Sequence, residues 1–282
     1  MNAILLISII IGCAVQNIAK KPYTDKTSGG AYFYSTFMGL SAMLFFVCTS
    51  GGFSWDNGII PYAIGFAVSY MACTVGSVIA TGCGSLSLTA LVLSYSLMIP
   101  AFYGLIFKKD PVSAGFIPGM ILLAISLFLI NKKESDKHFN FKWIISIFIA
   151  FVGNGMCSVV QNMQQVRFDG AYKNEFMITS LLIVTLVSLV MFLIRERHEA
   201  KSYFRYGILP SAISGVLNGM VNLFVMLLTS RNMPMSLMFP LISSGGIIIT
   251  YLVSRLYYKE KLTKLQFVGF VMGIASVIFL NI

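Results

Sequence analysis

Ten apolar runs, each about as long as a bilayer is thick, constrain the fold of this 282-residue chain more than any other feature. A helix needs about 20 mainly apolar residues to cross a membrane. Charged residues, glycine and proline separate the runs from one another. The sequence therefore predicts an all-α integral membrane protein with ten transmembrane helices. The runs lie at residues 3–19, 31–49, 59–80, 86–107, 112–131, 143–165, 172–194, 206–229, 234–257 and 264–281.

Composition excludes a water-soluble domain. Only 11% of the residues are charged and 57% are apolar, whereas a soluble domain carries about 25% charged residues. No loop approaches the roughly 50 residues that an independent domain needs. The runs are also about twice as long as the strands of a membrane β-barrel. We therefore expect lipid to surround the chain and the helices themselves to carry its function.

The basic residues predict how the chain is oriented. Fifteen of the 20 Lys and Arg residues follow the first, fifth, seventh and ninth runs, and five lie on the other side. Short loops rich in Lys and Arg stay in the cytoplasm. The bias predicts a multi-pass protein of the plasma membrane with both termini outside the cytoplasm. Scattered loop charge of this kind explains the net charge of +10 without a nucleic-acid partner.

The residue types needed for catalysis or metal binding are absent from the apolar runs. His138 and His198 lie in charged loops, and no run holds two carboxylates. The five cysteines have no short paired spacing and are interpreted as small buried apolar residues. An intramembrane enzyme would need nucleophiles, paired acids or metal ligands within the helices. We therefore expect no enzyme activity, no metal and no cofactor.

The second half of the chain repeats the first. The order of the matches predicts two units, residues 1–135 and 136–282, of five helices each. Because five crossings is an odd number, the second unit is inverted relative to the first, as in many transporters. The matches pair Val15, Gln16 and Asn17 with Val160, Gln161 and Asn162; Gly30, Ala31 and Tyr32 with Gly170, Ala171 and Tyr172; Pro61 with Pro210; Ser87 with Ser236; and Ser94 with Ser244.

A short acidic turn follows the fourth run and the ninth run, as Lys109–Asp110 and Lys259–Glu260, and the final run is rich in glycine. With ten helices in two inverted units, the chain resembles the EamA-type members of the drug/metabolite transporter superfamily. The resemblance implies a small-solute carrier or exporter of the plasma membrane. It also implies a central cavity lined by the first four runs of each unit, with the fifth and tenth runs at the periphery. The chain departs from the family in having Asp110 where Glu is usual and in lacking basic tails.

Polar residues recur at helical spacing inside several runs. Asn154, Ser158 and Gln161 share one face of the sixth run, and Asn218 and Asn222 share one face of the eighth. A buried amide without a partner costs about 2 to 7 kcal/mol. The stripes predict one central, water-filled cavity. The alternative is that each amide only joins helices, at about 0.6 to 2 kcal/mol per interhelical hydrogen bond.

Three further candidates lie at the ends or in the middle of runs. Tyr32 and Tyr172 occupy matching positions, and Tyr70 is in mid-span. Glu175 lies in the first turn of the seventh run, where it either couples transport to protons or complements the helix dipole. The predicted substrate-binding residues are Gln16, Asn17, Tyr32, Tyr70, Ser94, Asn154, Ser158, Gln161, Asn162, Tyr172, Glu175, Asn218, Asn222 and Ser244.

These features predict a transporter, most simply an exporter, of a small polar or zwitterionic metabolite or a drug-like solute, which works by alternating access. A flippase for a lipid-linked polar headgroup is the alternative within transport, and an intramembrane enzyme is the alternative of another class. The glycine pairs of the fifth and tenth runs predict a scaffold contact or a homodimer contact. Pro100 and Pro240 are expected to interrupt or bend the fourth and ninth runs.

Overall fold

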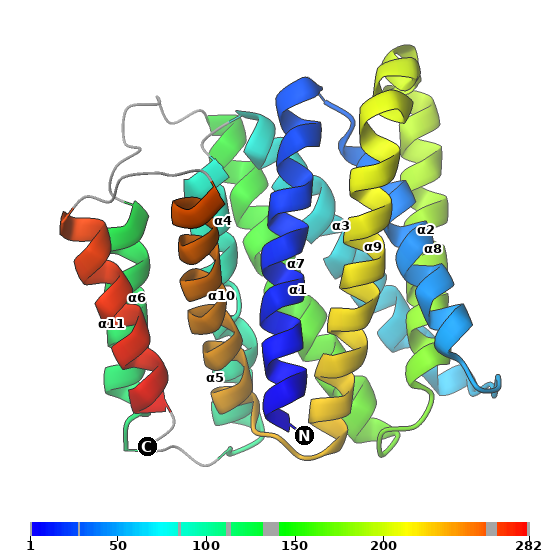
Figure 1. Cartoon of the computed structure of the whole chain (residues 1–282). Coiled ribbons are helices and arrows are strands. Elements are labelled where there is room, and N and C mark those ends of the chain that lie inside the picture. The colour runs from blue at the N-terminus through cyan, green and yellow to red at the C-terminus, as the bar shows by residue number, and fades with distance from the viewer. Residues whose placement is uncertain are drawn as a thin grey trace.

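The computed structural model describes residues 2–27, 29–83, 86–110, 114–131, 141–257 and 264–280, and these residues form helices and no strand. Figure 1 shows the helices standing side by side, with α1 beginning and α11 ending at the same end of the bundle. The helices are α1 (Asn2–Lys26), α2 (Ala31–Thr49), η1 (Asn57–Ile59), α3 (Ile60–Cys83), α4 (Leu86–Tyr95), α5 (Met98–Phe107), α6 (Phe116–Asn131), α7 (Phe141–Arg167), α8 (Lys173–Arg195), η3 (Arg197–Glu199), α9 (Ala200–Ser230), α10 (Met235–Tyr257) and α11 (Lys264–Leu280).

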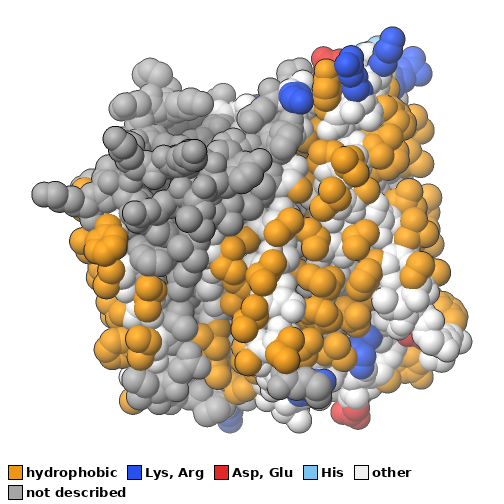
Figure 2. All heavy atoms as spheres, viewed as in Figure 1, with side chains coloured by type: hydrophobic (Ala, Val, Ile, Leu, Met, Phe, Trp, Pro, Cys, Tyr) orange, Lys and Arg blue, Asp and Glu red, His pale blue; other side chains and the backbone are white. Residues whose placement is uncertain are grey.

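The prediction of an all-α chain is confirmed, and each predicted apolar run contains helix. Five helical segments within the described ranges are long and apolar enough to cross a membrane: Ala31–Thr49, Asn57–Cys83, Phe141–Arg167, Lys173–Arg195 and Arg197–Ser230. Figure 2 shows hydrophobic side chains covering the flank of the bundle, with Lys and Arg gathered where α8 ends and α9 begins. This arrangement fits a membrane protein.

Several helix boundaries differ from the sequence prediction; α9, for example, begins at Ala200 and not at residue 206. α1 continues past residue 19 to Lys26, because Tyr23 is fully buried and its hydroxyl donates a 2.7 Å hydrogen bond to the Gly30 carbonyl. The run 86–107 is divided into α4 and α5. Pro100 has no N–H to donate to the carbonyl of Ser96, and that carbonyl accepts instead from Ile99 N at 3.0 Å. The helix α10, in contrast, continues through Pro240.

The helices pack in a defined set of pairs. α3 packs against α7, α1 against α9, and α2 against both α8 and α9. α5 packs against α10, and α6 against α11. In the last pair, Gly115 faces the backbone of Phe279 and Gly273 faces Ser126, so these glycines join two helices of one chain. The homodimer contact stays a prediction, and the predicted boundary at residues 135 and 136 lies outside the described residues.

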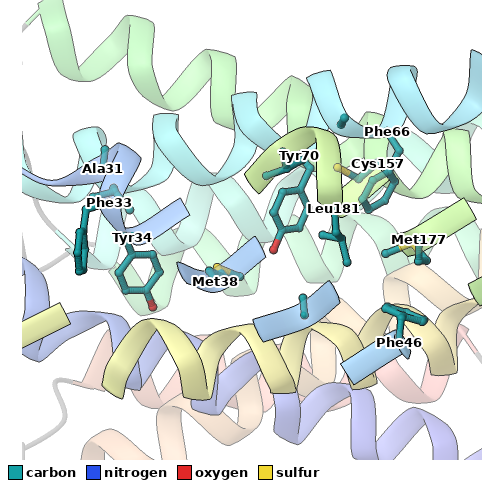
Figure 3. Close-up of a cluster of buried hydrophobic side chains, with 14 of the residues drawn as sticks. Ala31, Phe33, Tyr34, Met38, Phe46, Phe66, Tyr70, Cys157, Met177 and Leu181 are labelled. Atoms are coloured by element: carbon teal, nitrogen blue, oxygen red, sulfur yellow. The ribbon is translucent and has the colours of Figure 1, made fainter. Parts of the chain in front are cut away.

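A buried aromatic cluster holds α1, α2, α3, α8 and α9 together. Phe33, Tyr34, Phe66 and Phe176 are fully buried in it. In Figure 3 the hydroxyls of Tyr34 and Tyr70 point to the same side, where α9 supplies partners for both. Tyr34 Oη lies 2.6 Å from Ser214 Oγ. The tyrosine hydroxyl groups of this hydrophobic core therefore lie along α9.

Two carboxylates accept hydrogen bonds from the first backbone N–H groups of helices to which they do not belong. The residue before α2 is Gly30, whose φ of 81° suits glycine and which has no side chain to cap the helix. Glu196, from the end of α8, accepts instead from the N–H groups of Tyr32 (3.1 Å) and Phe33 (3.0 Å). Burial raises the pKa of Glu196, and these N–H donors partly offset the rise. Asp110 likewise accepts from Met235 N (2.8 Å) and Ser236 N (3.2 Å) at the start of α10.

We predict that Gly153→Ala lowers the thermal stability of the purified protein. A Cβ at Gly153 would lie 2.6 Å from Ser69 O and 2.7 Å from Cys73 N, both on the backbone of α3. Overpacking of this kind costs about 1 to 3 kcal/mol, more than the roughly 1 kcal/mol that alanine gains over glycine in a helix. The measurement is thermal unfolding in detergent, followed by tryptophan fluorescence.

Gly82→Ala is the matched control, because Gly82 is also helical and, apart from its own helix, no atom of the described residues lies within 4 Å of the position that a Cβ would take there. This control should be neutral or stabilising. A Gly153→Ala protein that melts at or above the temperature of the control would contradict the close α3–α7 contact.

Candidate functional site

Five predicted site residues form one hydrogen-bonded group that joins four helices; we name it the amide network. Gln16 of α1 accepts from Asn218 Nδ2 of α9 at 3.2 Å. Tyr70 of α3 donates to Asn218 Oδ1 at 3.1 Å. Asn222 Nδ2 donates to the same oxygen at 2.8 Å, and Gln161 Nε2 of α7 donates to Asn222 Oδ1 at 2.8 Å. Residues far apart in the sequence therefore meet inside the bundle.

The spacing of these residues explains why they meet. Asn218 and Asn222 are four residues apart and so lie on one face of α9, where Asn222 Nδ2 also donates to the Asn218 carbonyl at 2.8 Å. Tyr70 and Gln161 come from α3 and α7, which pack against each other. Gln161 and Tyr70 are both buried. For these five residues, the interhelical bonding that was the alternative prediction is observed.

Asn154 forms a second junction, about two turns before Gln161 on α7. Its Nδ2 donates to Ser96 Oγ at 2.6 Å, in the turn that separates α4 from α5. Its Oδ1 accepts from Cys73 Sγ of α3 at 3.4 Å. Cys73 was interpreted as an apolar filler, whereas here it acts as a weak donor. The sequence did not predict Ser96 as a site residue. It did predict the interruption near Pro100 that produces this turn.

Asn162 differs from the other amides because neither Nδ2 nor Oδ1 has a hydrogen-bond partner among the described residues. The side chain is only 2% exposed. It lies on α7 between Ser158, one turn before it, and Gln165, whose Oε1 accepts from Ser230 of α9 at 3.0 Å. A buried amide left in this state costs about 2 to 7 kcal/mol. Asn162 therefore has an amide NH2 group and a carbonyl oxygen for which the described residues supply no partner.

Lys20 brings a positive charge toward these polar groups. The sequence placed it in a loop after the first run, but it lies on α1 one turn beyond Gln16. Its Nζ is 3.5 Å from Ser77 Oγ of α3. Ser77 in turn lies one turn beyond Cys73 on α3. The sequence signal that could have revealed Lys20 is its i, i+4 spacing from Gln16.

The other predicted residues whose side chains are described lie outside the amide network. Glu175 accepts from Ser54 N at 2.9 Å and Ser54 Oγ at 3.3 Å, so it ties the loop before α3 to the start of α8. Tyr32 and Tyr172 lie at the starts of α2 and α8. The Ser94 carbonyl, on α4, accepts from Ser243 Oγ of α10 at 3.1 Å. Asn17 lies in α1 and Ser244 in α10, and their side chains are outside the described set.

The chemistry of this region is that of neutral hydrogen-bonding groups beside one cation. In the described part of the chain, no group of three or more His, Cys, Asp and Glu residues is placed to hold a metal ion. Amides and hydroxyls can bind a polar solute by hydrogen bonds. Lys20 can add an electrostatic contact.

We predict that Asn162→Leu raises thermal stability, since leucine has a similar volume and removes two unpaired polar atoms. The expected gain is about 1 to 3 kcal/mol. Gln161→Leu should do the opposite, because it leaves Asn222 Oδ1 without its donor. Unfolding in detergent measures both. Destabilisation by Asn162→Leu equal to that of Gln161→Leu would show that Asn162 is bonded within the protein.

Comparison with known proteins supports the fold and leaves the activity open. No family model matches the chain. An uncharacterized protein of Haemophilus influenzae is 22% identical over 189 residues, which cover 64% of this chain and 62% of that protein. The chain thus matches less than two thirds of this relative. A solved crystal structure superposes with a TM-score of 0.74 at 10% sequence identity, covering 100% of this chain and 98% of the other; at this identity the likeness concerns the fold alone.

Proposed function

We propose that this protein is a membrane transporter that moves a small polar or zwitterionic solute by alternating access around the amide network. The observation that carries the proposal is Asn162, a buried amide with no partner among the described residues, on the same helix as Gln161 of the network. A helix-joining role accounts for an amide with partners. It does not account for one without them, because an apolar residue would stabilise that position better.

The proposal includes ten spans in two inverted five-helix units. α4 and α5 together form one interrupted span, which makes ten with the other long helices. In the inverted repeat, α1 corresponds to α7 and α3 corresponds to α9. The contact of α1 with α9 is then equivalent to the contact of α7 with α3, and both pairs pack together. The same relation pairs α2 with α8, α5 with α10, and α6 with α11, and these helices are also in contact. Gly30 and Gly170, which the repeat aligns, both have positive φ, at 81° and 78°.

Location and direction are part of the same proposal. The exposed Arg195, Arg197, Lys201 and Arg205 gather at one end of the bundle, which supports a cytoplasmic assignment of that end. Both termini would then lie outside the cytoplasm of a plasma-membrane exporter. The bonds from Ser54 to Glu175 favour an anchoring role for this carboxylate over proton coupling.

The two alternatives make different demands on the molecule. A flippase needs a lateral opening for a lipid-linked headgroup, and an intramembrane enzyme needs reactive groups in contact with substrate. The amide network supplies hydrogen bonds and no nucleophile paired with a base. Transport of a water-soluble solute into liposomes that contain no lipid-linked substrate separates the carrier from the flippase.

The experiment screens the purified protein for thermal stabilisation by amino acids, sugars, nucleosides and cationic drugs, and then measures uptake of each stabilising solute into proteoliposomes. Binding to the folded state raises the melting temperature by an amount that grows with the ligand concentration relative to its dissociation constant. We expect at least one solute to bind and to be transported, and Asn162→Leu to lose both. Met163→Leu, at the neighbouring exposed position, is the control and should keep both. Wild-type uptake by a folded Asn162→Leu protein would contradict the proposed site.

A further inference from the structure

We propose that Lys20 is the charged group of the transport site and that it recognises a carboxylate on the transported solute. This inference rests on the proposed function and names the class of substrate. The sequence assigned Lys20 to a loop after the first apolar run. In the structure Lys20 is on α1, one turn from Gln16 of the amide network.

The environment of the ammonium group is polar and largely enclosed. Lys20 Nζ lies 3.5 Å from Ser77 Oγ, and Ser77 is only 2% exposed. One turn back along α3, Cys73 contacts Asn154 of α7. The cation therefore lies on the side of α1 that faces α3, the helix that carries Tyr70 of the amide network. Ionisable residues in such positions of a membrane bundle usually mark the path of a substrate or an ion.

The repeat gives an internal comparison for this position. In the alignment of the two halves, Gln16 corresponds to Gln161, and Lys20 then corresponds to Gln165. Pro61 corresponds to Pro210, and Ser77 then corresponds to Met226. Gln165 Nε2 lies 3.7 Å from Met226 Sδ, so the equivalent residues face each other in both halves. A neutral amide satisfies the contact between α7 and α9. The contact itself therefore does not require the positive charge that the chain carries between α1 and α3.

The chemistry selects the ligand class. The ammonium of lysine is a point charge with three donors, which suits a carboxylate. The amide of Asn162 offers one donor and one acceptor to the polar remainder of the solute. A solute that carries a single carboxylate beside an amine, amide or hydroxyl group uses both. The purely structural alternative is that Lys20 extends its alkyl chain along α1 and directs its charge to the basic end of the bundle.

The test compares pairs of solutes that differ only in their single acid group: leucine with leucinamide, phenylalanine with phenylalaninamide, and lactate with lactamide. Thermal stabilisation of the purified protein gives an apparent affinity for each. We expect an acid to bind the wild type and Lys20→Arg, and to bind Lys20→Met roughly 30-fold more weakly, as when one partner of a desolvated charge pair is removed. Lys26→Met, an exposed lysine on the same helix, should bind like the wild type.

Each possible result supports or overturns the assignment of Lys20. If an amide binds as well as its matched acid, or if Lys20→Met keeps the wild-type affinity for the acid, the inference fails while the transporter proposal stands. If Lys20→Met does not fold, the acid-to-amide ratio of the wild type and of Lys20→Arg still decides. If no member of these pairs binds, the inference is overturned, and failure of the wider solute screen would then overturn the proposed function as well.

Discussion

An amide inside an apolar bundle needs a hydrogen-bond partner, because neither lipid nor hydrocarbon side chains can supply one. This requirement fixes how α1, α3, α7 and α9 meet. Asn218 is the centre of the arrangement: its Oδ1 accepts from Tyr70 and Asn222, and its Nδ2 donates to Gln16. Moving any of these helices along its axis by one turn, about 5.4 Å, would break the bonds that it makes to the other helices. Among the described amides Asn162 is the exception to the requirement, and the functional proposal starts from it.

The same requirement operates at the ends of the helices. The first backbone N–H groups of a helix have no partner within it. Glu196 supplies one for α2 and Asp110 supplies one for α10, in each case from a different helix or from the turn that follows it. Glu175 binds the loop at Ser54. These carboxylates therefore tie segments together, and the proposed recognition of a solute depends on the interior amides and Lys20.

Much of the architecture could be predicted from the sequence, because the length of an apolar run and the 3.6-residue period are local properties. They predicted the helices and placed Asn218 with Asn222 on one face. What they could not predict is the partner across the bundle. Lys20 was assigned to a loop because a charge normally ends an apolar run, whereas the burial of Tyr23 against α2 extends the helix past it. Cys73 and Ser96 became polar partners only because α7 brings Asn154 between them.

The most direct test of the central claim asks whether water reaches the region of the amide network. Cys73, which contacts Asn154, can be kept as the only cysteine by replacing Cys13, Cys48, Cys83 and Cys157 with alanine. A membrane-impermeant, charged thiol reagent is then added to sealed vesicles, and labelling is compared with that of the SDS-unfolded protein. An alternating-access site predicts that Cys73 reacts in the folded protein and that a bound solute slows the reaction. Full protection from the reagent on both sides of the membrane, with complete reaction after unfolding, would show a dry bundle and contradict the account.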